Sequence, residues 1–112
     1  MADDCLFCKI AAGEIPVDVV RETDQTVAFR DINPQAPTHV LVIPRTHHRD
    51  IGELSRDGAL LTAVLQEAAA VAELEGLADY RVVFNTGEGA GQTVFHVHAH
   101  VLGGRAMTWP PG

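Results

Sequence analysis

One short segment of this sequence decides the fold, and it reads Phe95-His96-Val97-His98-Ala99-His100-Val101. Its three histidines alternate with apolar residues. Successive side chains of a β-strand point to opposite faces, so a strand would place the three imidazoles in a row on one face. The apolar residues would then point into a core. We therefore predict a strand over residues 94–102 that carries a row of histidines.

A row of imidazoles suits two kinds of chemistry, which are metal binding and attack on an electrophile near neutral pH. His98 is central in the row. An imidazole that attacks phosphorus needs one free nitrogen, while the other nitrogen donates a hydrogen bond, for which a neighbouring backbone carbonyl is a suitable acceptor. The flanking histidines can stabilise charge on phosphoryl oxygens and pass a proton to a leaving group. The residues alone leave both kinds of chemistry open.

A glycine-rich loop over residues 86–93 leads directly into the histidines. Gly87, Gly89 and Gly91 allow the backbone to approach a ligand closely and to turn its N–H groups inward. By itself such a loop is typical of a flexible hairpin connection. Its position favours phosphate binding, because a phosphate held there would lie against the histidine row.

The other elements follow from periodicity and from turn residues. We predict a short helix over residues 4–12, strands over 17–22, 26–32, 39–43 and 80–85, and one long helix from Ser55 or Asp57 to Glu75. Short turns between strands, with one helix packed on the sheet, predict an α+β domain with a five-stranded, mostly antiparallel sheet. The nearly continuous apolar strand 39–43 is expected to be central.

The long helix is expected to pack through one apolar stripe. The predicted buried stripe consists of Leu61, Val64, Leu65, Ala68, Val71 and Ala72. The predicted opposite, polar side consists of Gln66, Glu67, Ala70 and Glu73.

Length and charge exclude several classes of protein. The 112 residues predict a single domain, 1–112. A formal net charge of −7 with scattered basic residues argues against nucleic-acid binding. No apolar run is long enough for a membrane span, and the acidic start, Met1 to Asp4, is unlike a signal peptide. We therefore expect a cytoplasmic protein without a membrane or nucleic-acid partner.

The two cysteines, Cys5 and Cys8, form a C-x-x-C pair, which is typical of half a zinc site or of a redox pair. The redox interpretation requires a thioredoxin-like βαβ context, which the sequence lacks. His47 and His48 are adjacent and must point apart, so at most one is expected to share a site with the cysteines. His39 opens the central strand and is either a polar strand end or a member of the site.

These residues resemble a known family over nearly the whole chain. Residues 91–102, GQTVFHVHAHVL, resemble the signature of the histidine-triad (HIT) family, and residues 31–39 and 41–44 resemble its upstream half. Gly103-Gly104-Arg105 and the terminal residues 109–112 look like its Hint branch, the nucleoside phosphoramidases.

The resemblance implies a fold and an activity. It implies a homodimer whose two sheets join into one ten-stranded sheet, with the tail 103–112 near the partner's site. It further implies hydrolysis of the P–N bond of purine nucleoside phosphoramidates, through a nucleotidyl-histidine intermediate and without a cofactor in the chemistry.

The resemblance also assigns roles by motif position. His98 would be the nucleophile, His100 would contact the phosphoryl oxygens, and His39 and His96 would complete the polar cluster. Thr93 would donate to the phosphate or to the leaving amine. The nucleotide would be bound by Asp31 at the ribose, by Ile32 and Phe29 at the base, by Asn85, Gly91, Gln92 and Thr93 at the phosphate, and by Trp109 reaching the partner subunit's site.

Cys5 and Cys8 depart from the animal Hint pattern and look like the C-x-x-C of many bacterial members. The resemblance then implies a structural zinc held by Cys5, Cys8, His47 and His96, which is a closed tetrahedral ligand set. His96 would in that case be structural and not an acid or base.

Two other functions stay open at this point. The same fold supports dinucleoside polyphosphate hydrolysis or nucleotidyl transfer, against which the short chain and the tail argue. The chain would alternatively be a zinc-stabilised nucleotide-binding module without physiological turnover. An aliphatic pocket with one Phe discriminates purines weakly, so the sequence does not separate adenine from guanine.

Overall fold

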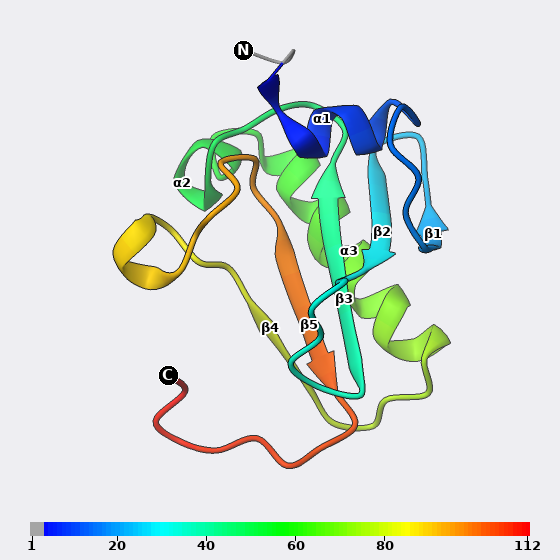
Figure 1. Ribbon diagram of the computed structural model, residues 1–112, viewed down its shortest axis with the longest axis vertical. Helices are drawn as coiled ribbons and strands as arrows, with labels where there is room; N and C mark the ends of the chain where they lie inside the picture. Colours follow the sequence, from blue (N-terminus) through cyan, green and yellow to red (C-terminus); the bar gives the residue numbers. More distant parts are fainter. Residues whose placement is uncertain (1–3) are drawn as a thin grey trace.

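A computed structural model describes residues 4–112 as a five-stranded sheet with helices on both faces (Figure 1). Residues 1–3, which begin the acidic N-terminus, lie outside the described part. In chain order the elements are α1 (Leu6–Ala11), β1 (Val19–Glu22), β2 (Thr26–Arg30), β3 (Thr38–Pro44), α2 (Ile51–Leu54), α3 (Gly58–Leu74), β4 (Tyr80–Val83), the 3₁₀ turn η2 (Glu88–Ala90) and β5 (Ala99–Gly103). No helix within residues 4–112 combines the length and the hydrophobicity needed to cross a bilayer.

The sheet has the strand order β1-β2-β3-β5-β4, and every neighbouring pair is antiparallel. The predicted α+β class and the central position of β3 are therefore confirmed. All six residues from His39 to Pro44 are buried, which explains why this strand reads as a continuous apolar run.

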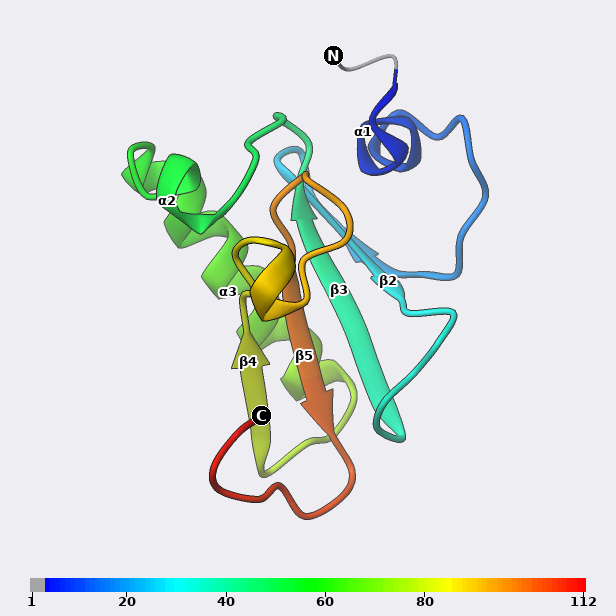
Figure 2. The ribbon, with the colours of Figure 1, turned by 60° about the vertical axis from the view of Figure 1, so that its left-hand side comes forward.

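The two faces of the sheet carry different layers (Figure 2). Val40 and Val42 of β3 belong to the core under α3, whereas Leu41 and Ile43 pack with α1 on the opposite face. This division follows from the period-two alternation of a strand. The α3 layer is the larger core, and the α1 layer leaves room for a cavity.

The histidine segment differs from its prediction in one respect. The β5 ladder begins only at Ala99, which pairs with Val42, so residues 94–98 lie outside the regular strand. The Val97 N–H instead donates to the carbonyl of His48 at 2.7 Å, in the loop that follows β3. The alternation nevertheless persists, because Val97, Ala99 and Val101 are all buried in the α3 core.

The long helix begins and ends close to its predicted bounds. Asp57 is its N-cap, and its carboxylate accepts from the Leu60 N–H at 3.1 Å. Two side chains depart from their predicted sides of the helix: Leu65, predicted in the buried stripe, is about half exposed, and Glu67, predicted on the polar side, is buried. Glu67 forms an ion pair with Arg21 of β1, which supplies the charge that makes its burial possible.

The sequence analysis did not find the short helix α2. Asp50 caps it by accepting from the Glu53 N–H, and Leu54 anchors it in the α3 core with no exposed surface. One turn of helix has too few apolar positions to show a helical period, which is why its pattern was not visible.

Because Leu54 is fully buried, we expect its truncation to destabilise the fold. Leu54→Ala should lower the free energy of unfolding by about 3 kcal/mol, because it removes buried methyl groups and leaves a cavity. The matched control is Leu74→Ala, since Leu74 is 60% exposed at the end of α3; it should cost less than about 1 kcal/mol. Urea unfolding measures both, and equal losses would contradict the assigned packing of α2.

Candidate functional site

A cavity of about 450 Å³ opens on the α1 face of the sheet. Several of the residues singled out in the sequence line it, and these are Phe29, Asp31, Ile32, Gly91, Thr93, His98 and His100. They come from β2 and the loop after it, from the glycine-rich loop, and from the histidine segment. The fold therefore brings together segments that are far apart in the chain.

The apolar wall of the cavity comes largely from residues that the sequence analysis did not assign to the site. Leu6, Phe7 and Ile10 of α1 line it, with Leu41 of β3 opposite. An apolar side on a short N-terminal helix is a visible signal, but it does not say what the helix packs against. The resulting lining is apolar on one side and polar at the histidines, which suits a ligand with an apolar part and a polar part.

His98 has a defined orientation in the cavity. Its Nδ1 lies 2.9 Å from the backbone carbonyl of His96, so Nδ1–H donates and Nε2 is left with a free lone pair. Burial lowers the pKa of His98, which keeps the imidazole neutral near pH 7. The ring of Phe7 packs edge-on against it, with 5.1 Å between ring centroids. This is the tautomer that a nucleophilic imidazole requires.

A second chain of hydrogen bonds orients His100. The Gln35 N–H donates to Nδ1 of His39 at 3.0 Å, so the proton of a neutral His39 must be on Nε2. His39 Nε2 lies 2.9 Å from Nδ1 of His100 and 3.4 Å from a carboxylate oxygen of Asp31. His100 therefore carries its proton on Nε2, which is buried and has no partner among residues 4–112. The pKa of His100 is lowered to about 4, mainly because the ring is buried.

The glycine-rich loop uses part of its own hydrogen-bonding capacity. The N–H groups of Gly91 and Gln92 donate to the carbonyls of Glu88 and Gly87. Within residues 4–112 no hydrogen bond uses the N–H of Thr93, which leaves it for a ligand. Asn85 lies beside the loop, since a Cβ on Gly91 would meet its Nδ2 at 3.9 Å.

Three residues expected at the nucleotide lie off the cavity lining. Trp109 is 83% exposed in the C-terminal tail, Asn85 lies behind Gly91, and the buried Gln92 side chain bonds to backbone groups. His39 also lies off the lining, behind His100.

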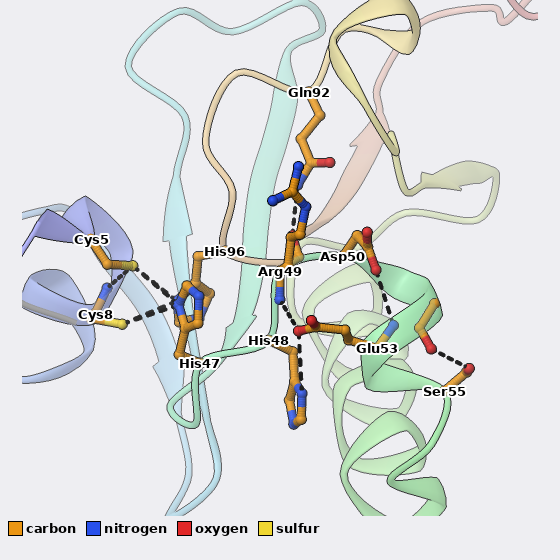
Figure 3. A network of polar contacts seen from close by, with 11 residues as sticks. Cys5, Cys8, His47, His48, Arg49, Asp50, Glu53, Ser55, Gln92 and His96 are labelled. Carbon is orange, nitrogen blue, oxygen red and sulfur yellow. Dashed lines mark hydrogen bonds and ion pairs between the residues drawn. The ribbon is translucent and has the colours of Figure 1, made fainter. Parts of the chain in front are cut away.

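A cluster of sulfur and nitrogen atoms lies between α1 and the histidine segment (Figure 3). Nδ1 of His96 is 3.3 Å from Sγ of Cys5 and 3.4 Å from Sγ of Cys8. Nδ1 of His47 is 3.5 Å from each sulfur and 3.2 Å from Nδ1 of His96. Of the adjacent histidines only His47 joins the cluster, because His48 points toward Glu53.

The separations fit a tetrahedral metal ion. Metal–sulfur distances of about 2.3 Å and metal–nitrogen distances of about 2.1 Å require S···N separations of about 3.6 Å and an N···N separation of about 3.4 Å. Nε2–H of His96 donates to the Pro44 carbonyl at 2.8 Å, which turns the lone pair of Nδ1 toward the cluster. Without a cation, burial and the neighbouring Cys5 raise the pKa of the Cys8 thiol to about 11. A dication would reverse this effect by favouring the thiolates.

The chain is similar to several known proteins over nearly its whole length. A family model described as HIT domain matches residues 12–107. The chain is 44% identical to the purine nucleoside phosphoramidase of Escherichia coli, covering 96% of this chain and 92% of that protein. It is 50% identical to a 14 kDa zinc-binding protein of Zea mays, and the match covers 96% of this chain and 87% of that protein. A crystal structure of a HIT family hydrolase from Legionella pneumophila superposes with a TM-score of 0.93 at 54% identity. The match covers 97% of this chain and 100% of that chain.

The two hydrogen-bond chains predict the histidine tautomers. At pH 7, His98 should carry its proton on Nδ1, whereas His39 and His100 should carry theirs on Nε2. Long-range ¹H–¹⁵N correlation spectra of the ¹⁵N-labelled protein measure this directly. An Nε2-protonated His98 would contradict the assigned role of the His96 carbonyl.

Proposed function

This chain belongs to the HIT family, and from that premise we propose that it is a purine nucleoside phosphoramidase that works through His98. The observation that carries the proposal is the pair of oriented imidazoles in one cavity. His98 offers a free Nε2, and His100 offers beside it an Nε2–H that has no partner within residues 4–112, with 4.9 Å between the ring centroids. A nucleophile next to a fixed donor is what phosphoryl transfer to histidine needs.

In the first step, Nε2 of His98 attacks the phosphorus of the nucleoside phosphoramidate. A bond forms between Nε2 and phosphorus, and the P–N bond of the substrate breaks, with its electron pair leaving on the amine. The amine takes up one proton from solvent water, and we propose that the Thr93 hydroxyl relays it. Nε2–H of His100 stabilises the charge on the phosphoryl oxygens.

In the second step, water attacks the nucleotidyl-histidine. An O–P bond forms, the bond from phosphorus to His98 breaks, and the water supplies the proton that replaces the one taken by the amine. The net reaction converts a phosphoramidate and water into a nucleoside monophosphate and a free amine. His39 acts only by holding the tautomer of His100.

The nucleoside lies along the apolar wall in this proposal. Phe29 and Ile32 contact the base, together with Phe7 of α1, and Asp31 accepts hydrogen bonds from the ribose hydroxyls. Asp31 supports this assignment because it lines the cavity and a carboxylate can accept several hydrogen bonds: one oxygen accepts from the Asn33 N–H at 2.8 Å, and the other lies 3.4 Å from Nε2 of His39. Thr93 and Gly91 form the phosphate side, and Asn85 lies behind Gly91 and supports it from there.

We propose that the cluster of Cys5, Cys8, His47 and His96 holds one structural zinc ion. The tetrahedral separations, the Cys₂His₂ donor set and the oriented lone pair of His96 support zinc. The zinc contributes folding energy and joins α1 to the histidine segment, and it takes no part in the phosphoryl transfer.

A homodimer completes the proposal. The edge strand β4 exposes Tyr80 and Val82, which supports pairing with a second copy into a ten-stranded sheet. Trp109 lies exposed in the tail, and we propose that it reaches the partner subunit's site and affects the choice of leaving amine.

Replacing the nucleophile tests the mechanism. His98→Asn should lower kcat for an adenosine phosphoramidate by more than about 10⁴-fold, because no nucleophile remains. AMP affinity should stay within about tenfold of the wild-type value, since the cavity walls are unchanged. Steady-state kinetics and calorimetric titration measure the two quantities.

Two controls accompany that experiment. His48→Asn removes a histidine that faces Glu53 and should retain wild-type kinetics. Parallel assays with diadenosine polyphosphates test the other reaction of the fold, and a higher kcat/KM on these substrates would replace the proposal. Absence of turnover on either substrate, with AMP still bound, would favour a binding module.

The adjacent histidines provide a matched test of the metal. The wild-type protein and His48→Ala should each bind about one zinc ion per chain, whereas His47→Ala should bind less than about half, because it loses one of four ligands. His47→Ala should also melt at a lower temperature than His48→Ala in zinc-containing buffer. Elemental analysis and calorimetry measure both, and equal zinc contents would contradict the site.

A further inference from the structure

Gln92 is a polar side chain that is only 2% exposed, and it hydrogen-bonds to three separate backbone segments. Figure 3 shows it beside Arg49, which belongs to one of them. Its Oε1 accepts from the Gly87 N–H at 2.9 Å. Its Nε2 donates to the Arg49 carbonyl at 2.8 Å and to the Val94 carbonyl at 3.1 Å. The side chain therefore links the start of the glycine-rich loop, its end, and the loop that carries His47.

Both polar atoms of the Gln92 amide make hydrogen bonds inside the protein. A primary amide has two N–H donors and one carbonyl acceptor, and both donors and the acceptor are used by backbone groups. Gln92 also does not line the 450 Å³ cavity, although Gly91 and Thr93 on either side of it do. Its side chain therefore acts on a ligand only through the position of its neighbours.

The hydrogen bonds of Gln92 determine where Thr93 lies. On one side of Thr93, the Gln92 N–H donates to the Gly87 carbonyl at 3.0 Å, which closes residues 87–92 into a ring together with the side-chain bond. On the other side, Nε2 of Gln92 holds the Val94 carbonyl. The bond to Arg49 ties this unit to the segment that also holds Val97 through the His48 carbonyl.

We infer that Gln92 is a positioning residue for phosphoryl binding: its side chain fixes Thr93 against His98 without touching the substrate. The inference rests on the proposed function, because it assigns the phosphate to Thr93. It predicts a specific selectivity. Loss of the Gln92 amide should weaken ligands that carry a phosphate and should leave the nucleoside part, which contacts the apolar wall, nearly unaffected.

Two substitutions separate the bonds of Gln92. Gln92→Met keeps the length and volume of the side chain and removes all three hydrogen bonds. Gln92→Glu keeps an acceptor for Gly87 but places a second oxygen opposite the carbonyls of Arg49 and Val94, which repel it. The matched control is Val71→Ala, which lowers stability in the α3 core without touching the loop.

The experiment compares AMP and adenosine binding by calorimetric titration, kcat on an adenosine phosphoramidate, and amide hydrogen exchange at Gly87. In Gln92→Met, AMP affinity should fall about tenfold and adenosine affinity should change less than about twofold. The value of kcat should fall about 100-fold, because Thr93 is displaced. Exchange at Gly87 should be faster in Gln92→Met than in Gln92→Glu, and Val71→Ala should show none of these selective effects.

Two results would overturn the inference: equal weakening of AMP and adenosine, or Gly87 exchange in Gln92→Met at the wild-type rate. Failure of the proposed function gives a different result, since the wild-type protein would then neither bind AMP nor hydrolyse the phosphoramidate. Hydrogen exchange at Gly87 still decides in that case whether Gln92 holds the loop.

Discussion

The site depends on one constraint, which is the alternation of side chains along residues 96–101. Val97, Ala99 and Val101 are buried in the core under α3. Because neighbouring residues of an extended chain point to opposite sides, this anchoring turns the three histidines to the α1 face. A shift of one residue would bury the imidazoles under α3 and expose the apolar residues, so the core holds the register of the site.

The site also depends on the orientation of each imidazole, which hydrogen bonds to backbone groups fix. The His96 carbonyl orients His98, and the Gln35 N–H orients His39 and, through it, His100. Burial lowers the pKa of both His98 and His100, so the neutral forms are the relevant ones. Donors and acceptors that are oriented before the ligand arrives need no rearrangement during a reaction, which is the basis of electrostatic preorganisation.

The cluster of Cys5, Cys8, His47 and His96 is physically continuous with the cavity. His96 contributes Nδ1 to the cluster, while its carbonyl accepts from His98 in the cavity. Phe7 lies in sequence between the two cysteines, and its ring contacts His98. A six-residue helix such as α1 has little stability by itself. Its attachment to the histidine segment therefore determines whether α1 is held where it forms the apolar wall of the cavity. The four cluster residues therefore affect the cavity although none of them lines it.

Local patterns in the sequence determined much of this protein. Four patterns, each only a few residues long, predict local structure that the fold contains. They are the alternating histidines, the apolar central strand, the Asp57 helix cap and the C-x-x-C pair. Features that depend on a distant partner were decided only by the tertiary structure. The β5 ladder starts at Ala99, opposite Val42 of β3, because the Val97 N–H donates to the His48 carbonyl in the loop after β3 and not to β3 itself. Glu67 is buried because Arg21, 46 residues away, neutralises it. Leu6, Phe7 and Ile10 form the cavity wall because the cluster and β3 hold α1 over the sheet. A local pattern reports which side of an element is apolar, whereas only the packed chain decides what that side meets.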